Sequence, residues 1–263
     1  MTMSRFALIL KLVQVSLLTA LQYRANFVIE GGMALFWLVW NIAPVVLVFL
    51  AKPVIAGWHL LEAMLVVGWF LVLQAILEGV INPNLVGVVE RIRKGTLDFV
   101  LLKPADAQLL VSFTRVVPSK FVDLVGGILI LVVSCRRLGI VPTPQHILQA
   151  VLLLGMGTAI LYSLWLLVIS MAFWFVKIDN LSYLFAAIFD AGRWPIQVFK
   201  GVVRVVLTFV VPVGLITSYP AMALLGMLSW RGVGVACLLA LLFVSLSRFV
   251  WRFALAHYTS ASS

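Results

Sequence analysis

Residues 61–95 read LEAMLVVGWFLVLQAILEGVINPNLVGVVERIRKG, and this stretch joins two kinds of sequence. Its first part, residues 61–81, is almost wholly apolar. A helix needs roughly 20 mostly apolar residues to cross a hydrocarbon core about 30 Å thick, so this part predicts a membrane-spanning helix. Charge follows at once, because six charged side chains lie between positions 90 and 103: Glu90, Arg91, Arg93, Lys94, Asp98 and Lys103. The stretch therefore predicts a helix inside the membrane followed by an element outside it.

The composition of the whole chain supports the same class. Of the 263 residues, 64% are hydrophobic and 11% are charged, and the mean hydropathy is +1.18. Soluble domains carry about a quarter charged residues, so lipid must surround most of this chain. Five further apolar segments are long enough to span: residues 27–51, 116–138, 147–176, 199–219 and 233–253. We therefore expect an all-α membrane protein with six transmembrane helices in one transmembrane domain over residues 1–263.

Basic residues give the expected orientation. The net charge of +10 would suggest nucleic acid in a soluble protein, but here the basic residues are scattered between apolar blocks, so we expect no nucleic-acid partner. Lys and Arg are retained in cytoplasmic loops. With a cytoplasmic N-terminus, all but four of the 19 Lys and Arg residues fall on or near the inner side, the exceptions being Lys52, Arg136, Arg137 and Arg231. Both termini are therefore predicted to be cytoplasmic.

The N-terminal residues 4–23 have a different pattern. On a helical wheel one arc collects the polar side chains of Ser4, Lys11, Gln14, Thr19 and Gln22. This pattern predicts an amphipathic helix that lies in the plane of the cytoplasmic leaflet. The alternative, an additional spanning helix, would leave Lys11 near the centre of the bilayer, which is costly.

A short cytoplasmic helix is predicted over residues 83–94. Asn82 and Pro83 are typical of a helix start, and Gly95 is typical of a helix end. An apolar stripe at helical spacing is formed by Leu85, Val88, Val89 and Ile92. Two interpretations stay open: a solvated interfacial helix, or a docking element presented to a cytoplasmic partner.

The end of the fifth predicted span is irregular. Pro212 interrupts the span, and Ser218, Tyr219 and Pro220 then predict its end. Residues 220–228 are apolar but too short to cross the bilayer. They predict a re-entrant helix between spans five and six, with a simple extracellular hairpin as the alternative.

Polar residues inside predicted spans mark either interhelical hydrogen bonds or a transport route. Asn41 and Gln74 fall near the middle of the first and second spans, and Glu78 lies one turn below Gln74 on the same helix face. The chain holds no nucleotide-binding glycine loop and no HExxH or GxSxG motif. Its three histidines, His59, His146 and His257, lie near the ends of different spans. We therefore predict no catalytic site, no metal site and no cofactor in this chain, and Cys135 and Cys237 predict no disulfide framework.

Two motifs carry a resemblance to a known family. The phrase IRKGTLDFVLLKP at residues 92–104 is similar to the signature I-R-x-G-x-L-D-x-x-L-x-x-P of a bacterial branch of uncharacterised permeases. The phrase YPAMALLG at residues 219–226, which follows Pro212, is similar to the ending of the same branch. With the in-plane helix, the six spans and the charged helix between spans two and three, nearly the whole chain resembles the permease subunit of a type-2 ATP-binding-cassette exporter.

The resemblance implies a bacterial plasma (inner) membrane protein that exports a lipid, glycolipid, drug or peptide. Two separate cytoplasmic ATPase subunits would bind ATP and Mg²⁺, and a second permease copy or a paralogue would pair with this chain among membrane lipids. The implied ATPase-coupling residues are Leu85, Val88, Val89, Glu90, Arg91, Ile92, Arg93 and Lys94. The implied translocation path contains Asn41, Gln74, Glu78, Thr208 and Thr217. A non-transporting membrane scaffold stays open, as does a secondary transporter, although the inverted repeats of many secondary transporters are not apparent.

Overall fold

The computed structural model describes residues 24–104, 106–175 and 179–258, and before them only Lys11, Gln14, Val15 and Leu18. Within these residues, five helices are long and apolar enough to cross a membrane, or six if one sharply bent helix pair counts as a single span. The chain is therefore an all-α multi-pass membrane protein, as its composition predicts. The in-plane helix predicted over residues 4–23 lies almost wholly outside the described residues.

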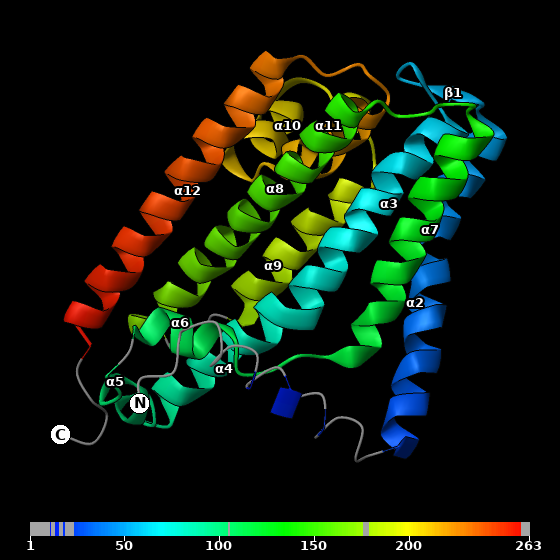
Figure 1. The fold of residues 1–263 in the computed structure, drawn as a ribbon. Coiled ribbons are helices and arrows are strands. Elements are labelled where there is room, and N and C mark those ends of the chain that lie inside the picture. The colour runs from blue at the N-terminus through cyan, green and yellow to red at the C-terminus, as the bar shows by residue number, and fades with distance from the viewer. Residues whose placement is uncertain are drawn as a thin grey trace.

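The elements follow one another along the chain as an almost unbroken series of helices (Figure 1). The long helices are α2 (Arg24–Ala51), α3 (Leu60–Ile76), α7 (Phe121–Arg137), α8 (Pro144–Ser170) and α12 (Trp230–Ala256). The shorter α-helices are α4 (Asn82–Arg93), α5 (Asp98–Leu101), α6 (Ala107–Ser112), α9 (Asp179–Asp190), α10 (Gly201–Val205) and α11 (Val213–Leu224). Two π-helical segments, η1 (Leu77–Ile81) and η6 (Val206–Val210), interrupt the α-helices, and 3₁₀ turns occupy η2 (Pro118–Lys120), η3 (Met171–Phe173), η4 (Ala191–Arg193) and η5 (Ile196–Val198). A small antiparallel hairpin of β1 (Val54–Ile55) and β2 (Trp58–His59) joins α2 to α3.

The α3 and α4 helices form one continuous helical segment. It runs from Leu60 to Arg93, contains 34 residues, and passes through the π-helical turn η1. At 1.5 Å per residue it is about 50 Å long, which exceeds a hydrocarbon core of about 30 Å. One end of this segment therefore projects beyond the membrane.

Asn82 does not cap the start of α4, so that prediction is wrong. The backbone angles of Ile81 and Asn82 are helical, and the Asn82 N–H donates to the Leu77 carbonyl in the π-helical pattern. At the start of a new helix the first backbone N–H groups have no acceptor within the helix. Here the preceding helical turn supplies a carbonyl acceptor for the Asn82 N–H, so no cap is needed. Pro83 follows and has no backbone N–H, so one helical hydrogen bond is missing there, but the helix continues.

The end of α4 agrees with the prediction. Gly95 adopts a φ of +66°, a left-handed conformation that glycine adopts without steric cost. The Gly95 N–H donates to the Ile92 carbonyl at 3.2 Å, and the Thr96 N–H donates to the Arg91 carbonyl at 2.9 Å. These two bonds form a Schellman motif, which stops the helix at the end of the basic turn.

The region predicted as a fifth span is not one helix. Residues 201–210 and 213–224 form two helical pieces that meet at an angle of 86°. The bend falls at Pro212, whose ring fixes φ and removes a backbone donor. Pro220, in contrast, lies inside α11, which continues to Leu224, so the predicted helix end at Ser218–Pro220 is wrong.

The α9 helix was not predicted, and it changes the path of the chain. It begins at the end of the bundle that holds α4 and the C-terminal end of α12, whereas α10 and α11 lie at the opposite end (Figure 1). The chain therefore rises through α9, η4 and η5 before it reaches Lys200. The expectation that Lys200 and Arg204 lie on the same side as α4 is consequently wrong. A hydropathy search misses α9 because it has only 12 residues.

The core is built around α3, which packs against α7, α11 and α2, and around α8, which packs against α12 and α11. Gly68 of α3 and Gly127 of α7 lie at the closest approach of two helices. A Cβ atom on Gly127 would lie 2.8 Å from the Gly68 carbonyl oxygen, and one on Gly68 would lie 2.8 Å from the Leu131 side chain. Small residues of this kind allow membrane helices to approach backbone to backbone.

Candidate functional site

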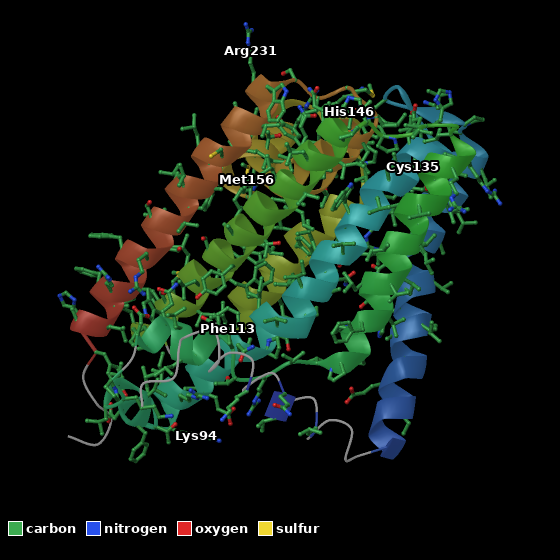
Figure 2. All side chains as sticks on the ribbon, viewed as in Figure 1. Lys94, Phe113, Cys135, His146, Met156 and Arg231 are labelled. Atoms are coloured by element: carbon green, nitrogen blue, oxygen red, sulfur yellow. The ribbon has the colours of Figure 1, made fainter. Side chains whose placement is uncertain are left out.

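The first candidate region is the projecting end of the molecule, formed by α4, α5 and α6; we call it the α4–α6 surface. Lys94 lies at this end, whereas His146 and Arg231 lie at the opposite end (Figure 2). The apolar stripe of α4 faces inward, because Leu85, Val88 and Val89 are buried and Ile92 is partly buried against the core. These four predicted coupling residues therefore pack within the chain itself.

The other four predicted coupling residues form the outer side of α4. Glu90, Arg93 and Lys94 are exposed, and Arg91 is partly exposed. Lys94 Nζ lies 2.6 Å from Glu90 Oε1, one helical turn away. An exposed pair of this kind adds little stability, so Lys94 can exchange Glu90 for a group on a partner surface at little cost.

Asn84 anchors α4 to the chain segment that leads into α7. Its Nδ2 donates to the Val80 carbonyl at 2.6 Å and to the Arg115 carbonyl at 2.7 Å. Its Oδ1 accepts hydrogen bonds from the Thr114 N–H, the Thr114 hydroxyl and the Arg115 N–H at 2.7–2.8 Å. Nothing in the sequence indicated this role, because the partners Thr114 and Arg115 lie about 30 residues away.

A second polar group fixes α6 to α8 and α12. Asp106 accepts hydrogen bonds from the Gln108 and Leu109 N–H groups and forms an ion pair with Arg248 of α12. The Arg248 guanidinium holds the pKa of the Asp106 carboxyl below its usual range. Arg248 also donates to Gln108, whose amide in turn donates to the Tyr162 hydroxyl of α8 at 3.0 Å. The α4–α6 surface is therefore fastened to two membrane-spanning helices.

The tip of the α4–α6 surface is apolar and exposed. Phe99 and Leu102 are 69% and 80% exposed. Between them Val100 is buried, as is the preceding Leu97, so α5 is held firmly while two large side chains point outward. Sequence reasoning missed this pair, because both residues follow the end of the helix predicted over residues 83–94.

The second candidate region is a cavity among the spans, which we call the polar cavity. Its volume is about 320 Å³, and α2, α3, α9 and the start of α7 form its walls. Its lining residues are Trp37, Trp40, Asn41, Gln74, Leu77, Glu78, Lys120, Asp123, Ala186, Phe189, Asp190 and Arg193. The structure thus brings together three of the five predicted path residues and adds charged residues that the sequence did not indicate.

The three predicted path residues of the polar cavity differ in their hydrogen bonding. Asn41 Nδ2 donates to Gln74 Oε1 at 3.2 Å, which joins α2 to α3. Glu78 accepts from Asn82 Nδ2 at 3.0 and 3.3 Å, and Asn82 Oδ1 accepts from the Trp165 indole of α8 at 3.3 Å. Interhelical hydrogen bonding thus explains Asn41 and Gln74 in part, whereas Glu78 faces a cavity with only a neutral partner among the described residues.

Thr208 and Thr217 lie outside the polar cavity. Thr217 is fully buried in α11 and donates to the Val213 carbonyl at 3.0 Å. Thr208 lines a different cavity, of about 480 Å³, between α10, α11 and the start of α12, where Arg204 is its charged member. The five predicted path residues therefore do not form one site.

Several helices of bilayer length, packed around one core, define a multi-pass membrane protein. The chain belongs to the ABC-2 family of transporter proteins, because the model of that family, described as ABC-2 family transporter protein, matches residues 35–262. It is thus a transmembrane permease of the ABC transporter class, which confirms the resemblance to a type-2 ABC permease. No curated protein matches the chain, and no solved structure matches it.

Proposed function

We propose that this chain is the membrane-spanning subunit of an ATP-driven exporter in the bacterial plasma membrane. Two separate cytoplasmic ATPase subunits would bind ATP and Mg²⁺, and a second permease, identical or paralogous, would complete the transport route. The substrate would be hydrophobic or amphipathic. The observation that carries this proposal is the continuous helical segment Leu60–Arg93, which lines the polar cavity at Glu78 and ends at the exposed rim of α4.

Docking of the ATPase would use the outer side of the α4–α6 surface. The exposed apolar pair Phe99 and Leu102 would insert into the partner, and Glu90, Arg93 and Lys94 would surround this contact with charge. Large apolar side chains near the centre of a contact and charge at its rim are the usual arrangement of protein interfaces. The buried stripe of α4 then transmits force, since it joins the docked surface to the bundle.

Movement of the ATPase subunits would reach the polar cavity through α4. The α6 helix packs against α4 and α5, and Asn84 ties α4 to the segment that follows α6, so the α4–α6 surface would move as one body. The π-helical turn η1 lies between this body and α3, and such turns are frequent at functional positions in helices. A tilt of α4 would therefore displace Glu78, which sits in that turn.

The orientation follows from the same proposal. The α4 end would be cytoplasmic, together with both termini. The pair α10–α11 would form the re-entrant element at the outer side, since the chain bends sharply at Pro212 and α11 packs against α8. There Gly226 lies against His146. This element covers residues 201–224 and so begins earlier than the predicted 220–228.

Co-purification with an ATPase tests the proposal. The tagged full-length chain is purified from its native membrane in mild detergent, and we expect a stoichiometric ATPase to accompany it. For the double variant Phe99→Asp plus Leu102→Asp, the amount of co-purified ATPase should fall at least about tenfold, because a carboxylate would replace each apolar anchor. Arg93→Glu plus Lys94→Glu should reduce it less and should uncouple ATP hydrolysis from transport.

The matched control is Val141→Asp, which changes a side chain that is equally apolar and exposed at the opposite end of the bundle. It should keep the ATPase. Absence of any ATPase from the wild-type preparation, or equal ATPase loss in the control, would contradict docking at the α4–α6 surface.

A further inference from the structure

We infer that the polar cavity binds the positively charged group of an organic cation, with Glu78 as its anionic anchor. This inference names a substrate class for the proposed export function and rests on that function. Three features of the cavity support it: the balance of charge, the aromatic side chains at the wall and the way Glu78 is held.

The charges of the polar cavity do not cancel. Two of its acidic residues have a basic neighbour: Asp190 Oδ1 lies 3.1 Å from Arg193, and Asp123 Oδ2 lies 3.5 Å from Lys120. Glu78 has no such neighbour within ion-pair distance in the part of the chain that the structure describes. By formal charge, three carboxylates against two basic side chains make the cavity net negative. A cation is therefore the ligand charge that the cavity favours.

Asp123 is a second, independent sign of an incomplete site. It is 1% exposed, and its Oδ1 has no hydrogen-bond partner among the described residues. A buried carboxylate oxygen without a partner is costly. Such an atom is expected where a donor or a positive charge arrives from outside the chain.

Aromatic rings complete the recognition of a cation. Trp37 and Trp40 of α2 both line the cavity, and they are 47% and 58% exposed. The face of an indole ring attracts ammonium and other organic cations. Behind the cavity wall, the guanidinium of the lining residue Arg193 already lies 5.4 Å from the centre of the buried Phe70 ring.

Asn82 holds the Glu78 carboxylate in place. It donates to both carboxylate oxygens and is itself fixed by the Trp165 indole. A neutral amide directs the carboxylate without neutralising it, whereas a Lys or Arg at the same position would cancel its charge. Asn82 is thus a positioning residue that orients the Glu78 carboxylate.

The experiment measures binding of two ions that have nearly the same shape and opposite charge, tetraphenylphosphonium and tetraphenylborate. Equilibrium dialysis is carried out with the purified full-length chain in detergent, without an ATPase. We expect saturable binding of tetraphenylphosphonium to the wild type and binding at least about tenfold weaker to Glu78→Gln. Tetraphenylborate should bind no more than the micelle alone absorbs. Glu78→Asp should restore part of the affinity.

Glu62→Gln is the matched control, since Glu62 lies on the same helix outside the polar cavity and its loss should leave binding unchanged. Thermal unfolding shows whether Glu78→Gln remains folded. Equal affinity of the wild type and Glu78→Gln for tetraphenylphosphonium would overturn the inference, as would equal binding of tetraphenylborate. Because no ATPase is present, this result is separate from the docking experiment, and either proposal can fail alone.

Discussion

Glu78 and Asn84 lie six residues apart on the same continuous helix, yet their surroundings differ. Every polar atom of the Asn84 side chain has a protein partner within 2.8 Å. Glu78 faces a cavity, and its recorded partner is the neutral amide of Asn82. Close by, Asp123 has one carboxylate oxygen with no partner among the described residues. The polar atoms of Asn84 all have hydrogen-bond partners, whereas the polar cavity contains carboxylate oxygens that can still accept a hydrogen bond or a positive charge.

This difference separates structural polar residues from binding residues in a membrane protein. Both kinds are rare in a bilayer, and both are usually treated as functional signals. Polar groups whose hydrogen bonds are all made stabilise the fold, because their removal leaves buried partner groups without hydrogen bonds. Open groups cost stability and are expected to be retained for a ligand. Substitution should therefore affect stability in the first region and binding in the second.

The largest effect is expected for Asn84→Leu. Leucine has a similar volume but leaves the backbone groups of Thr114 and Arg115 without partners, at about 1–3 kcal/mol for each group that stays buried. We expect a loss of at least about 3 kcal/mol in the free energy of unfolding, measured as a lower thermal midpoint in detergent. Val86→Ala, at an exposed position of the same helix, should change the midpoint little. A midpoint equal to that of the wild type would show that Asn84 does not anchor α4.

A smaller effect is expected for Asp106→Asn, and it should depend on pH. The pKa of Asp106 is lowered in the folded protein, so the ion pair with Arg248 stabilises the fold above the unfolded-state pKa of about 3.9. That contribution is lost as pH falls through the lowered pKa. Asp106→Asn should cost about 1–2 kcal/mol at pH 7.

Thermal midpoints between pH 7 and pH 3 test the Asp106 prediction. The difference between the wild type and Asp106→Asn should shrink as the pH falls. The variant Glu62→Gln serves as the control for acid effects elsewhere in the chain. A difference that stays constant over this range would contradict the role of the Asp106 charge.

The smallest effect on stability is expected for Asp123→Asn. Removal of a buried charge with an unpartnered oxygen should leave the free energy of unfolding within about 1 kcal/mol of the wild type, or raise it. The same variant should weaken binding of tetraphenylphosphonium. A loss of stability as large as that of Asn84→Leu would show that the polar cavity is a structural network like the one around Asn84, and the comparison would fail.

Parts of the fold could be predicted from the sequence where the deciding physics is local. Apolar length alone predicts the helices α2, α3, α7, α8 and α12, and a single glycine predicts the end of α4. The prediction failed at Asn82, because a cap is defined by the absence of a preceding helix. It also failed for α9, since that helix is too short to pass a test of hydrophobic length.

The candidate site was only partly predictable for a related reason. Asn41, Gln74 and Glu78 were selected because polar residues are costly in a span, and all three line the polar cavity. Thr208 and Thr217 were selected by their place in an assumed fifth span. The bend at Pro212 places them elsewhere, because α11 buries Thr217 in the core.

The sequence by itself determined that this chain spans a membrane as helices and that charge concentrates beyond the second span, because both properties are sums over neighbouring residues. Only the tertiary structure decided which side of α4 is buried and which polar groups have partners. Asn84 bonds to residues about 30 positions away, and Asp106 pairs with a residue 142 positions away. Hydropathy cannot encode such pairings, since the energy of a buried polar atom depends on the partner that folding brings to it.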